Sequence, residues 1–191
     1  MSMGASLRGS PRGYRSHLMD ELVLNFAAAM AIGGLLGAIA LALSSDGREF
    51  LSENAVALGT AVAVLATATS LYLSEVAGLT PCRLCWFQRM AMYPLALIIP
   101  LAGSFGSRKD VARAGLAVAG VGIVVSLYHV QLQAFPEQSS FCEVSNPCTS
   151  SPMKAFDLLS IPQLTAVSFA IILVLSFTLL RHSNPTEMET S

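Results

Sequence analysis

The sequence predicts an all-α membrane protein: a four-helix transmembrane bundle with an additional apolar helix at the N-terminus. Of its 191 residues, 53% are hydrophobic and only 12% are charged, against about 25% charged residues in ordinary globular domains. The apolar residues gather in five uncharged runs, and about 20 such residues are enough for a helix to cross a bilayer. Because a backbone in lipid must satisfy its own hydrogen bonds, we expect these runs to be helices.

The expected helices lie, in chain order, at about 22–43, 56–76, 81–104, 111–132 and 162–180. We divide the chain into an N-terminal extension (1–53), a four-helix membrane domain (54–182) with an outer loop at 133–161, and a disordered tail (183–191). Within the outer loop, Met153–Leu159 mixes apolar and charged residues and is predicted to be a short surface helix. The 11 basic residues nearly balance the 12 acidic ones, so no nucleic-acid partner is expected.

The charges of the short loops predict the orientation of the helices. Arg108, Lys109 and Arg113 lie in the connector at 106–113, which the positive-inside rule places in the cytoplasm. The chain is then a multi-pass protein of the inner (plasma) membrane whose four cysteines all face the extracytoplasmic side. Thiols there meet an oxidising compartment.

The first cysteine pair is Cys82 and Cys85. Thr80 is predicted as the N-cap and Pro81 as the first helical residue, which places both thiols in the first turns, where the helix dipole favours thiolates. Arg89 follows Cys85 by four residues and shares its face of the helix. Charges within spans are usually functional, although Arg89 can alternatively extend to the lipid headgroups.

The second cysteine pair, Cys142 and Cys148, lies in a polar loop rich in Ser and Pro. A disulfide there is expected to be exposed and mobile, as labile, catalytic disulfides are. Two alternatives are a bridge that only staples the loop and a zinc site of four thiolates. Two pairs on one membrane face favour a redox relay, and no metal site is predicted.

Electrons that enter such a relay need an acceptor. Trp86 follows Cys85, so the haem motif CxxCH is absent from the sequence, and no GxGxxG motif follows a strand. These observations favour a lipid-soluble acceptor between the helices near the outer surface. Trp86, Phe87 and Tyr93 are interpreted as an interfacial aromatic belt rather than as the lining of its pocket.

The motif Pro81-Cys82-x-Leu84-Cys85-Trp86-x-Gln88-Arg89, followed by Met92-Tyr93-Pro94, resembles the signature of the disulfide bond formation protein B family, in particular its shorter BdbC-type members. The resemblance continues in Ser70–Glu75, in Tyr128-His129 and in Cys142 with Pro147-Cys148, and it covers about Val56–Arg181. Vitamin K epoxide reductase homologues also carry two cysteine pairs, but their loop pair precedes the CxxC. The order in this chain favours the former family.

The resemblance implies a membrane thiol oxidase that uses ubiquinone or menaquinone from the quinone pool and reoxidises a thioredoxin-like, DsbA-like dithiol partner outside the cytoplasm. Cys142 then forms the mixed disulfide with the partner, and Cys148 is its mate. Cys82 exchanges with the loop pair, and Cys85 passes electrons to the quinone.

The same resemblance places Arg89 beside the quinone, with Gln88 as its support and His129 as a weaker candidate for the quinone pocket. A histidine at a helix end is also commonly an interfacial hydrogen-bonding residue. The alternative function is that of a membrane scaffold or small-molecule carrier whose cysteines form only structural disulfides.

The first apolar run conflicts with the charge rule. Four spans from Asn54 onward place the start of an additional helix outside, yet Arg8, Arg12 and Arg15 precede it. We predict that translation starts at Met19, which removes these arginines. N-terminal sequencing of the purified native protein is expected to find no residue before Met19; a longer N-terminus would contradict this start.

Overall fold

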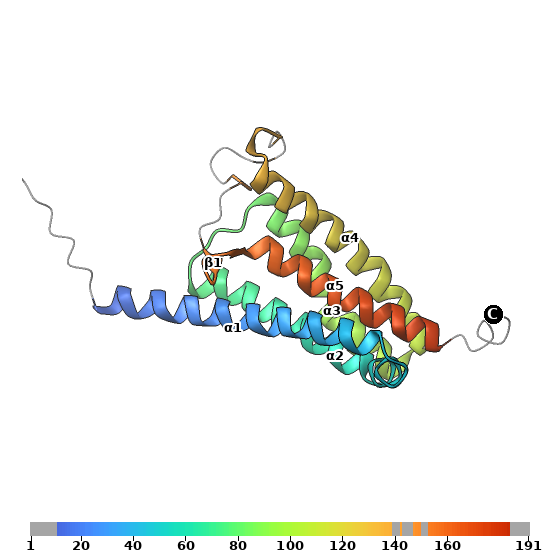
Figure 1. The fold of residues 1–191 in the computed structure, drawn as a ribbon. Helices are drawn as coiled ribbons and strands as arrows, with labels where there is room; N and C mark the ends of the chain where they lie inside the picture. Colours follow the sequence, from blue (N-terminus) through green and yellow to red (C-terminus); the bar gives the residue numbers. More distant parts are fainter. Residues whose placement is uncertain (1–10, 139–141, 143–146, 150–152, 184–191) are drawn as a thin grey trace, which may run out of the picture.

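The computed structural model describes residues 11–138, 142, 147–149 and 153–183, with side chains from Leu18 onward. Within that part of the chain, the long helices are α1 (Pro11–Ala42), α2 (Ser45–Leu71), α3 (Arg83–Phe105), α4 (Arg108–Ala134) and α5 (Ile161–His182) (Figure 1). All five contain a span long and apolar enough to cross a membrane. The predicted all-α membrane fold is thereby confirmed.

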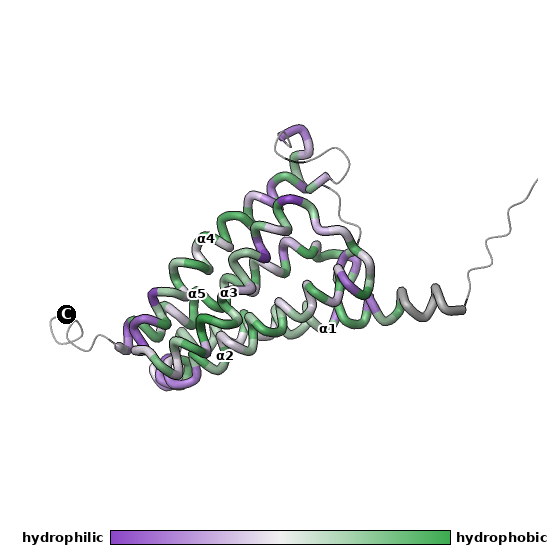
Figure 2. Tube along the Cα trace, turned by 180° about the vertical axis from the view of Figure 1, so that it is seen from behind, coloured by the Kyte–Doolittle hydropathy of each residue, from purple (hydrophilic) through white to green (hydrophobic). Residues whose placement is uncertain are grey.

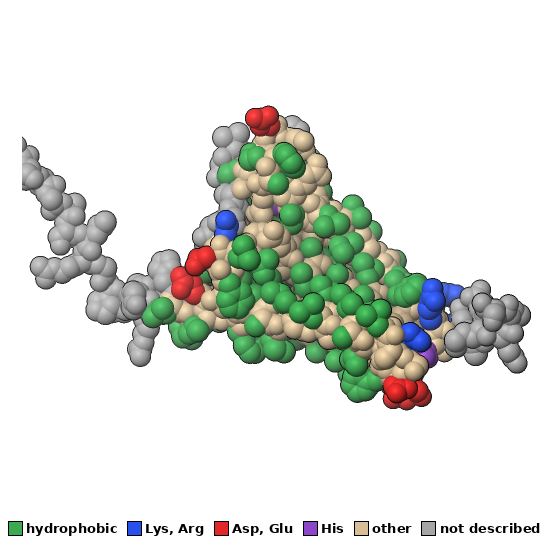
Figure 3. Space-filling view, in the orientation of Figure 1, with side chains coloured by type: hydrophobic (Ala, Val, Ile, Leu, Met, Phe, Trp, Pro, Cys, Tyr) green, Lys and Arg blue, Asp and Glu red, His purple; other side chains and the backbone are tan. Residues whose placement is uncertain are grey.

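Hydrophobic residues run along the helices, whereas hydrophilic residues gather near their ends (Figure 2). On the face seen in Figure 3, the charged side chains lie toward the ends of the molecule, and hydrophobic side chains cover the surface between them. Such an apolar band between polar ends is the surface that a helical bundle presents to lipid.

Serine residues begin three of the helices. Gly47 N donates to Ser44 Oγ at 3.1 Å before α2, and Asp110 N donates to Ser107 Oγ at 3.2 Å before α4. Ser160 N donates to Gln163 Oε1 at 2.8 Å at the start of α5, where Pro162 occupies the first turn. These caps satisfy backbone groups that a helix leaves without an internal partner, and they fix where the chain turns.

Helix α5 holds the bundle together because it packs against α1, α2 and α4. Phe169 is its largest fully buried side chain, and its ring lies against α4 at Gly122. A Cβ at Gly122 would collide with this ring. The glycine therefore allows α4 and α5 to approach closely, as small residues do between membrane helices.

The segment Met153–Leu159 is not the short helix that was expected. Strand β1 (Lys154–Ala155) pairs antiparallel with β2 (Leu159–Ser160). Phe156 and Asp157 have φ values of 51° and 57°, and Leu158 N donates to Ala155 O at 3.0 Å. Two central residues with positive φ make the tight turn of a hairpin, which a helix cannot accommodate.

Several element bounds differ from the expected ones. α3 begins at Arg83, two residues later than predicted, and α2 begins at Ser45 and continues into a π-helical turn at Tyr72–Val76. The expected boundary between 53 and 54 thus falls inside α2, so the division into an extension and a domain stays a prediction. Apart from Ser183, the expected disordered tail lies outside the described residues.

The close approach at Gly122 predicts a stability defect. Gly122→Ala is expected to cost about 1–3 kcal/mol because the added methyl group overpacks a filled interface. Thermal unfolding of the purified protein in detergent measures the loss. Gly120→Ala is the matched control, since no described residue lies within 4 Å of a Cβ at Gly120. Equal unfolding temperatures for the two variants would contradict the packing argument.

Candidate functional site

The CxxC pair lies at the N-terminus of α3, with Cys82 itself as the N-cap. Cys82 has φ −72° and ψ 173°, and Cys85 N donates to Cys82 Sγ at 3.4 Å. The two sulfurs are 3.0 Å apart. Thr80 is therefore not the cap, which corrects the expectation from sequence. A sulfur that accepts a backbone N–H at a helix N-terminus is held where negative charge is favoured.

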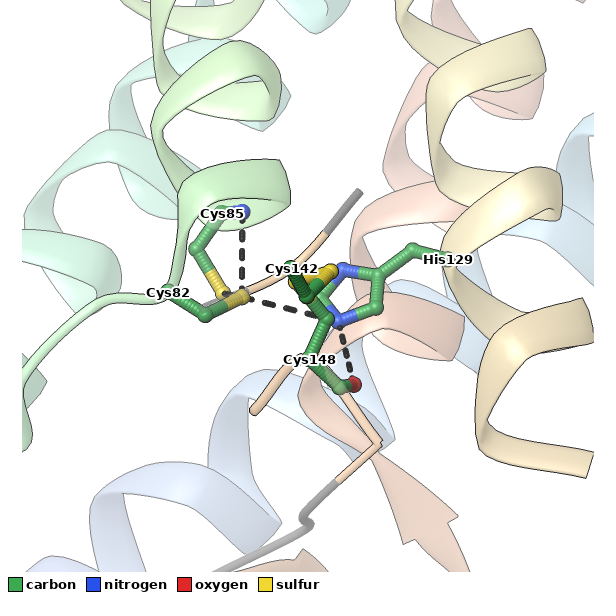
Figure 4. The surroundings of a disulfide bond; sticks show 5 residues. All are labelled: Cys82, Cys85, His129, Cys142 and Cys148. Carbon is green, nitrogen blue, oxygen red and sulfur yellow. Dashed lines mark hydrogen bonds between the residues drawn. A yellow bond between two sulfur atoms is a disulfide. The ribbon is translucent and has the colours of Figure 1, made fainter. Parts of the chain in front are cut away.

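His129 connects the CxxC pair to the outer loop (Figure 4). It comes from α4 and is 1% exposed. Its Nε2 lies 3.0 Å from the carbonyl oxygen of Cys148 and 3.7 Å from Cys82 Sγ. A carbonyl oxygen only accepts, so Nε2 carries the proton and donates. In the neutral ring, the buried Nδ1 is then an acceptor, and it has no hydrogen-bond partner among the described residues.

The loop cysteines Cys142 and Cys148 form a disulfide, which lies beside the CxxC pair (Figure 4). Cys148 is 1% exposed and packs in one cluster with Cys82, Leu84 and Leu132. The expectation of an exposed bridge is therefore wrong for Cys148, while Cys142 is half-buried. The packing of Cys148 against α3 and α4 brings both cysteine pairs into contact.

The surroundings of Cys82 stabilise its thiolate. Cys82 precedes the spanning part of α3. The hydrogen bond from the Cys85 thiol holds the pKa of Cys82 well below its usual range, and the hydrogen bond from His129 lowers this pKa further, against the effect of burial. A stabilised thiolate is a better leaving group in disulfide exchange, and a cysteine with a low pKa stays in the thiolate form near neutral pH.

The four-thiolate zinc site considered above does not fit this state of the protein, because two of the four sulfurs are joined in the disulfide. Cys82, Cys85 and His129 place their ligand atoms within 4.8 Å of one another. An imidazole must lie this near to a cysteine sulfur to stabilise its thiolate.

Gln88 lies one turn below the CxxC pair and is 4% exposed. Its Nε2 donates to Ser126 Oγ at 3.0 Å, and Ser126 Oγ donates to the Gly122 carbonyl at 2.9 Å. Because Ser126 belongs to α4, this hydrogen bond fixes the Gln88 side chain of α3 against α4. A buried amide held in this way contributes to a polar site rather than to general packing.

The side chain of Arg89 points toward α2. Its Nη2 donates to the Ser70 carbonyl at 3.0 Å, and its Cζ lies 5.3 Å from the centroid of the Trp86 ring. Ser70 lies just before the π-helical turn at Tyr72–Val76, and such turns are frequent at functional sites. Two anchors hold the guanidinium between α2 and α3, which argues against simple snorkelling.

A cavity of about 360 Å³ opens beside these residues. Mainly apolar side chains from α1, α2, α3 and α5 line it, and Cys85, Arg89, Gln88, Tyr93 and His129 also face it. Its volume lies within the range of about 300–1,000 Å³ that is usual for small-molecule sites. The wall of this mainly apolar cavity thus includes both cysteines of the CxxC pair and one arginine. The prediction that Tyr93 belongs only to an aromatic belt is thus wrong, whereas Trp86 and Phe87 are exposed.

The structure brings all seven predicted site residues together, although their roles stay predictions. His129 contacts the cysteines directly and also lines the cavity. Sequence reasoning did not single out Ser70, Ser126 or Gln133 as site residues, because none of them belongs to a recognised catalytic motif. Ser126, His129 and Gln133 recur at helical spacing on one face of α4, and this polar stripe within an apolar run is the signal that points to Ser126 and Gln133.

The sequence is similar to disulfide formation proteins over about two thirds of its length. The family model "Disulfide bond formation protein DsbB" matches residues 52–179. A "Probable disulfide formation protein" of Oceanobacillus iheyensis is 42% identical over 135 residues, which cover 68% of this chain and 91% of the relative. The "Disulfide bond formation protein C" of Bacillus subtilis is 36% identical over 115 residues, 59% of this chain and 83% of the relative. No solved structure gives a significant match.

The low pKa of Cys82 predicts how its alkylation depends on pH. The rate is expected to reach half of its plateau well below pH 8.5, about the ordinary pKa of a cysteine thiol, because the thiolate persists as the pH falls. Cys85→Ala, which removes the strongest hydrogen bond to Cys82, is expected to move this midpoint to higher pH, and His129→Phe to move it less.

Mass spectrometry after iodoacetamide labelling measures these rates. Trypsin cleaves after Arg83 and so separates the two cysteines into different peptides. A wild-type midpoint at or above the ordinary thiol pKa would show that the contacts of Cys82 do not stabilise its thiolate.

Proposed function

The chain belongs to the disulfide bond formation protein DsbB family, and from this premise we propose that it is a thiol oxidase that passes electrons from a thioredoxin-like, DsbA-like dithiol protein to a quinone. A role in disulfide formation within a membrane follows from the family and from the five apolar helices. The observation that carries the finer proposal is one connected group of side chains. The loop disulfide contacts the CxxC pair, and Cys85 of that pair lines the cavity beside Arg89.

The first step of the proposed relay takes place at the loop disulfide. Cys142 is half-buried and Cys148 is buried, which supports Cys142 as the sulfur that a partner thiolate attacks. The bond from the partner sulfur to Cys142 forms as the Cys142–Cys148 bond breaks, and Cys148 leaves as a thiolate. The second partner thiolate then attacks the mixed disulfide, which releases Cys142 as a thiolate and the partner in its oxidised form.

The second step moves the electron pair from the loop to α3. When Cys82 and Cys85 are joined in a disulfide, a loop thiolate attacks Cys82, and Cys85 leaves as a thiolate. The remaining loop thiolate then attacks this mixed disulfide, so that the loop disulfide forms again and Cys82 leaves. The arrangement in the structure, with the loop oxidised and Cys82 and Cys85 free, corresponds to the product of this step. The Nε2–H of His129 stabilises the leaving Cys82 thiolate.

The cavity supplies the exit for the electrons. A quinone bound there would supply a two-electron, two-proton acceptor, so that Cys82 and Cys85 would become a disulfide again. Arg89 holds a fixed positive charge beside Cys85 because the Ser70 carbonyl and the Trp86 ring anchor it. Gln88, held by Ser126, keeps the adjacent wall polar. Ubiquinone and menaquinone both meet this description.

We also propose that the cysteine end of the bundle faces the extracytoplasmic side of the inner (plasma) membrane. Arg108, Arg113 and Arg181 lie near the opposite ends of their helices, away from the cysteines. This distribution agrees with the positive-inside rule. In sealed membrane vesicles, an added dithiol partner should then be oxidised only where the cysteine end faces outward.

The burial of Cys148 also supports a second candidate, in which the loop disulfide is a structural staple of a scaffold or carrier. Structural disulfides resist reduction by dithiol proteins, whereas a relay pair equilibrates with them. The two functions therefore differ in whether a reduced partner protein opens the Cys142–Cys148 bridge.

An assay of quinone reduction tests the oxidase proposal. Purified protein, a reduced thioredoxin-like dithiol protein and a quinone analogue are mixed, and the quinone absorbance is followed. We expect Cys85→Ser to abolish turnover. Arg89→Gln should raise the KM for the quinone about tenfold or more, because a hydrogen bond to a charged group contributes about 1.5–3 kcal/mol.

The matched control is Arg113→Gln, the same substitution at an exposed arginine near the start of α4, for which an unchanged KM is expected. The oxidase proposal fails if the wild type shows no quinone-dependent oxidation or if Cys85→Ser turns over undiminished.

A further inference from the structure

The wall of the cavity includes a helix that lies outside the family match. Leu24, Ala27, Met30, Ala31 and Gly34 of α1 line the cavity, whereas the matched residues begin at 52. Their spacing of three and four residues places them on one face of α1. At a rise of about 1.5 Å per residue, the ten steps from Leu24 to Gly34 extend over about 15 Å of helix. α1 thus borders the cavity over a long stretch and not at a single point.

Specific contacts hold the outer part of α1 against the bundle. Tyr72 Oη donates to Asp20 Oδ1 at 2.9 Å, and Phe156 N donates to Asn25 Oδ1 at 2.7 Å. Leu24 is 1% exposed, and it packs with the π-helical turn, α5 and the hairpin through Leu73, Leu164 and Ala155. These contacts connect α1 to the π-helical turn and to the hairpin, which are the same elements that surround the cysteine end.

The inner part of α1 lies against α2 and α5, two of the other helices that line the cavity. α1 packs on both α2 and α5, and in Figure 1 it passes in front of α2 with α5 beside it. A Cβ at Gly34 would lie 3.4 Å from Ile171 Cδ1 of α5, an ordinary van der Waals distance. α1 therefore covers the side of the cavity that lies between α2 and α5.

The cavity has two chemically different sides. Cys85, Gln88 and Arg89 come from α3, whereas every cavity-lining residue of α1 is apolar. A quinone has the same division, since its ring oxygens are polar and the chain attached to the ring is apolar. The α1 side offers only van der Waals contact and burial of apolar surface, which suit the apolar chain of a quinone.

We propose that α1 is a wall of the quinone site that binds the apolar chain of the quinone, and that Ala27 and Ala31 set the width available to this chain. This inference rests on the proposed oxidase function and adds a part of the site to it. Small side chains at these positions leave the space open, and larger ones fill it.

Binding of quinones to the full-length protein tests the wall. Trp86 is the single tryptophan of the chain, and its ring lies beside Arg89, which lines the cavity. Quenching of Trp86 fluorescence therefore reports quinone binding without turnover. Ala27→Phe and Ala31→Phe are each compared with Ala29→Phe, an exposed position on α1 that is not among the cavity-lining residues of the described chain.

We expect Ala27→Phe and Ala31→Phe to raise the Kd of a quinone that carries an alkyl chain about tenfold or more. The added phenyl ring would occupy the space that this alkyl chain needs. The Kd of a quinone without a chain should change much less, and Ala29→Phe should bind both quinones as the wild type does. The rate at which a reduced dithiol protein opens the Cys142–Cys148 bridge should be unchanged in all three variants, because this step takes place at the loop.

The wall proposal is overturned if Ala27→Phe and Ala31→Phe bind the chain-bearing quinone like Ala29→Phe, or if they weaken both quinones equally. Failure of the oxidase proposal gives a different result, because the Trp86 fluorescence of the wild type then shows no saturable quenching with either quinone. Thermal unfolding verifies that each variant is folded. Should either Phe variant fail to fold, Ala27→Val and Ala31→Val make the same change in a smaller step and are judged by the same comparison.

Discussion

The hydrogen bond from His129 Nε2 to the carbonyl oxygen of Cys148 joins the three elements on which the site depends. It ties the outer loop to α4, and the same nitrogen lies 3.7 Å from Cys82 Sγ at the start of α3. A buried imidazole has few partners to choose from, so this arrangement leaves little freedom for the ring. The loop disulfide is thereby held against the CxxC pair, and exchange between the two pairs needs no large movement of the helices.

The helices around this junction are positioned by contacts deeper in the bundle. Gly122 lets Phe169 of α5 press against α4, and one turn further along α4 Ser126 accepts a hydrogen bond from Gln88 of α3. His129 follows Ser126 by three residues and so lies on the same face. Packing of α5 on α4 thus determines where the polar face of α4 meets α3. In lipid, helices associate mainly through such close packing and hydrogen bonds, because apolar surface alone gives no preference for a neighbouring helix over lipid.

The same bundle separates two routes of access. In the proposed function, a soluble dithiol protein reaches the loop pair at the polar end, and a lipid-soluble acceptor enters the cavity among apolar side chains. Cys82 and Cys85 both border the cavity, and both pack with the loop cysteines. A three-residue spacing at a helix start keeps their sulfurs 3.0 Å apart, so the CxxC pair lies where the loop and the cavity meet.

The sequence by itself determined the membrane class and the two cysteine pairs and predicted a role for Arg89, because uncharged runs, CxxC spacing and a charge within a span are local patterns. Family membership followed from the same local motif. Only the tertiary structure decided that Cys82 is the N-cap, that Cys148 is buried and that Met153–Leu159 is a hairpin. The burial of Cys148 and the hairpin depend on residues distant in the chain, such as Asn25, which accepts a hydrogen bond from Phe156 across 131 positions. The same holds for α1, whose apolar pattern predicts a helix in lipid but contains no information on which helices it covers.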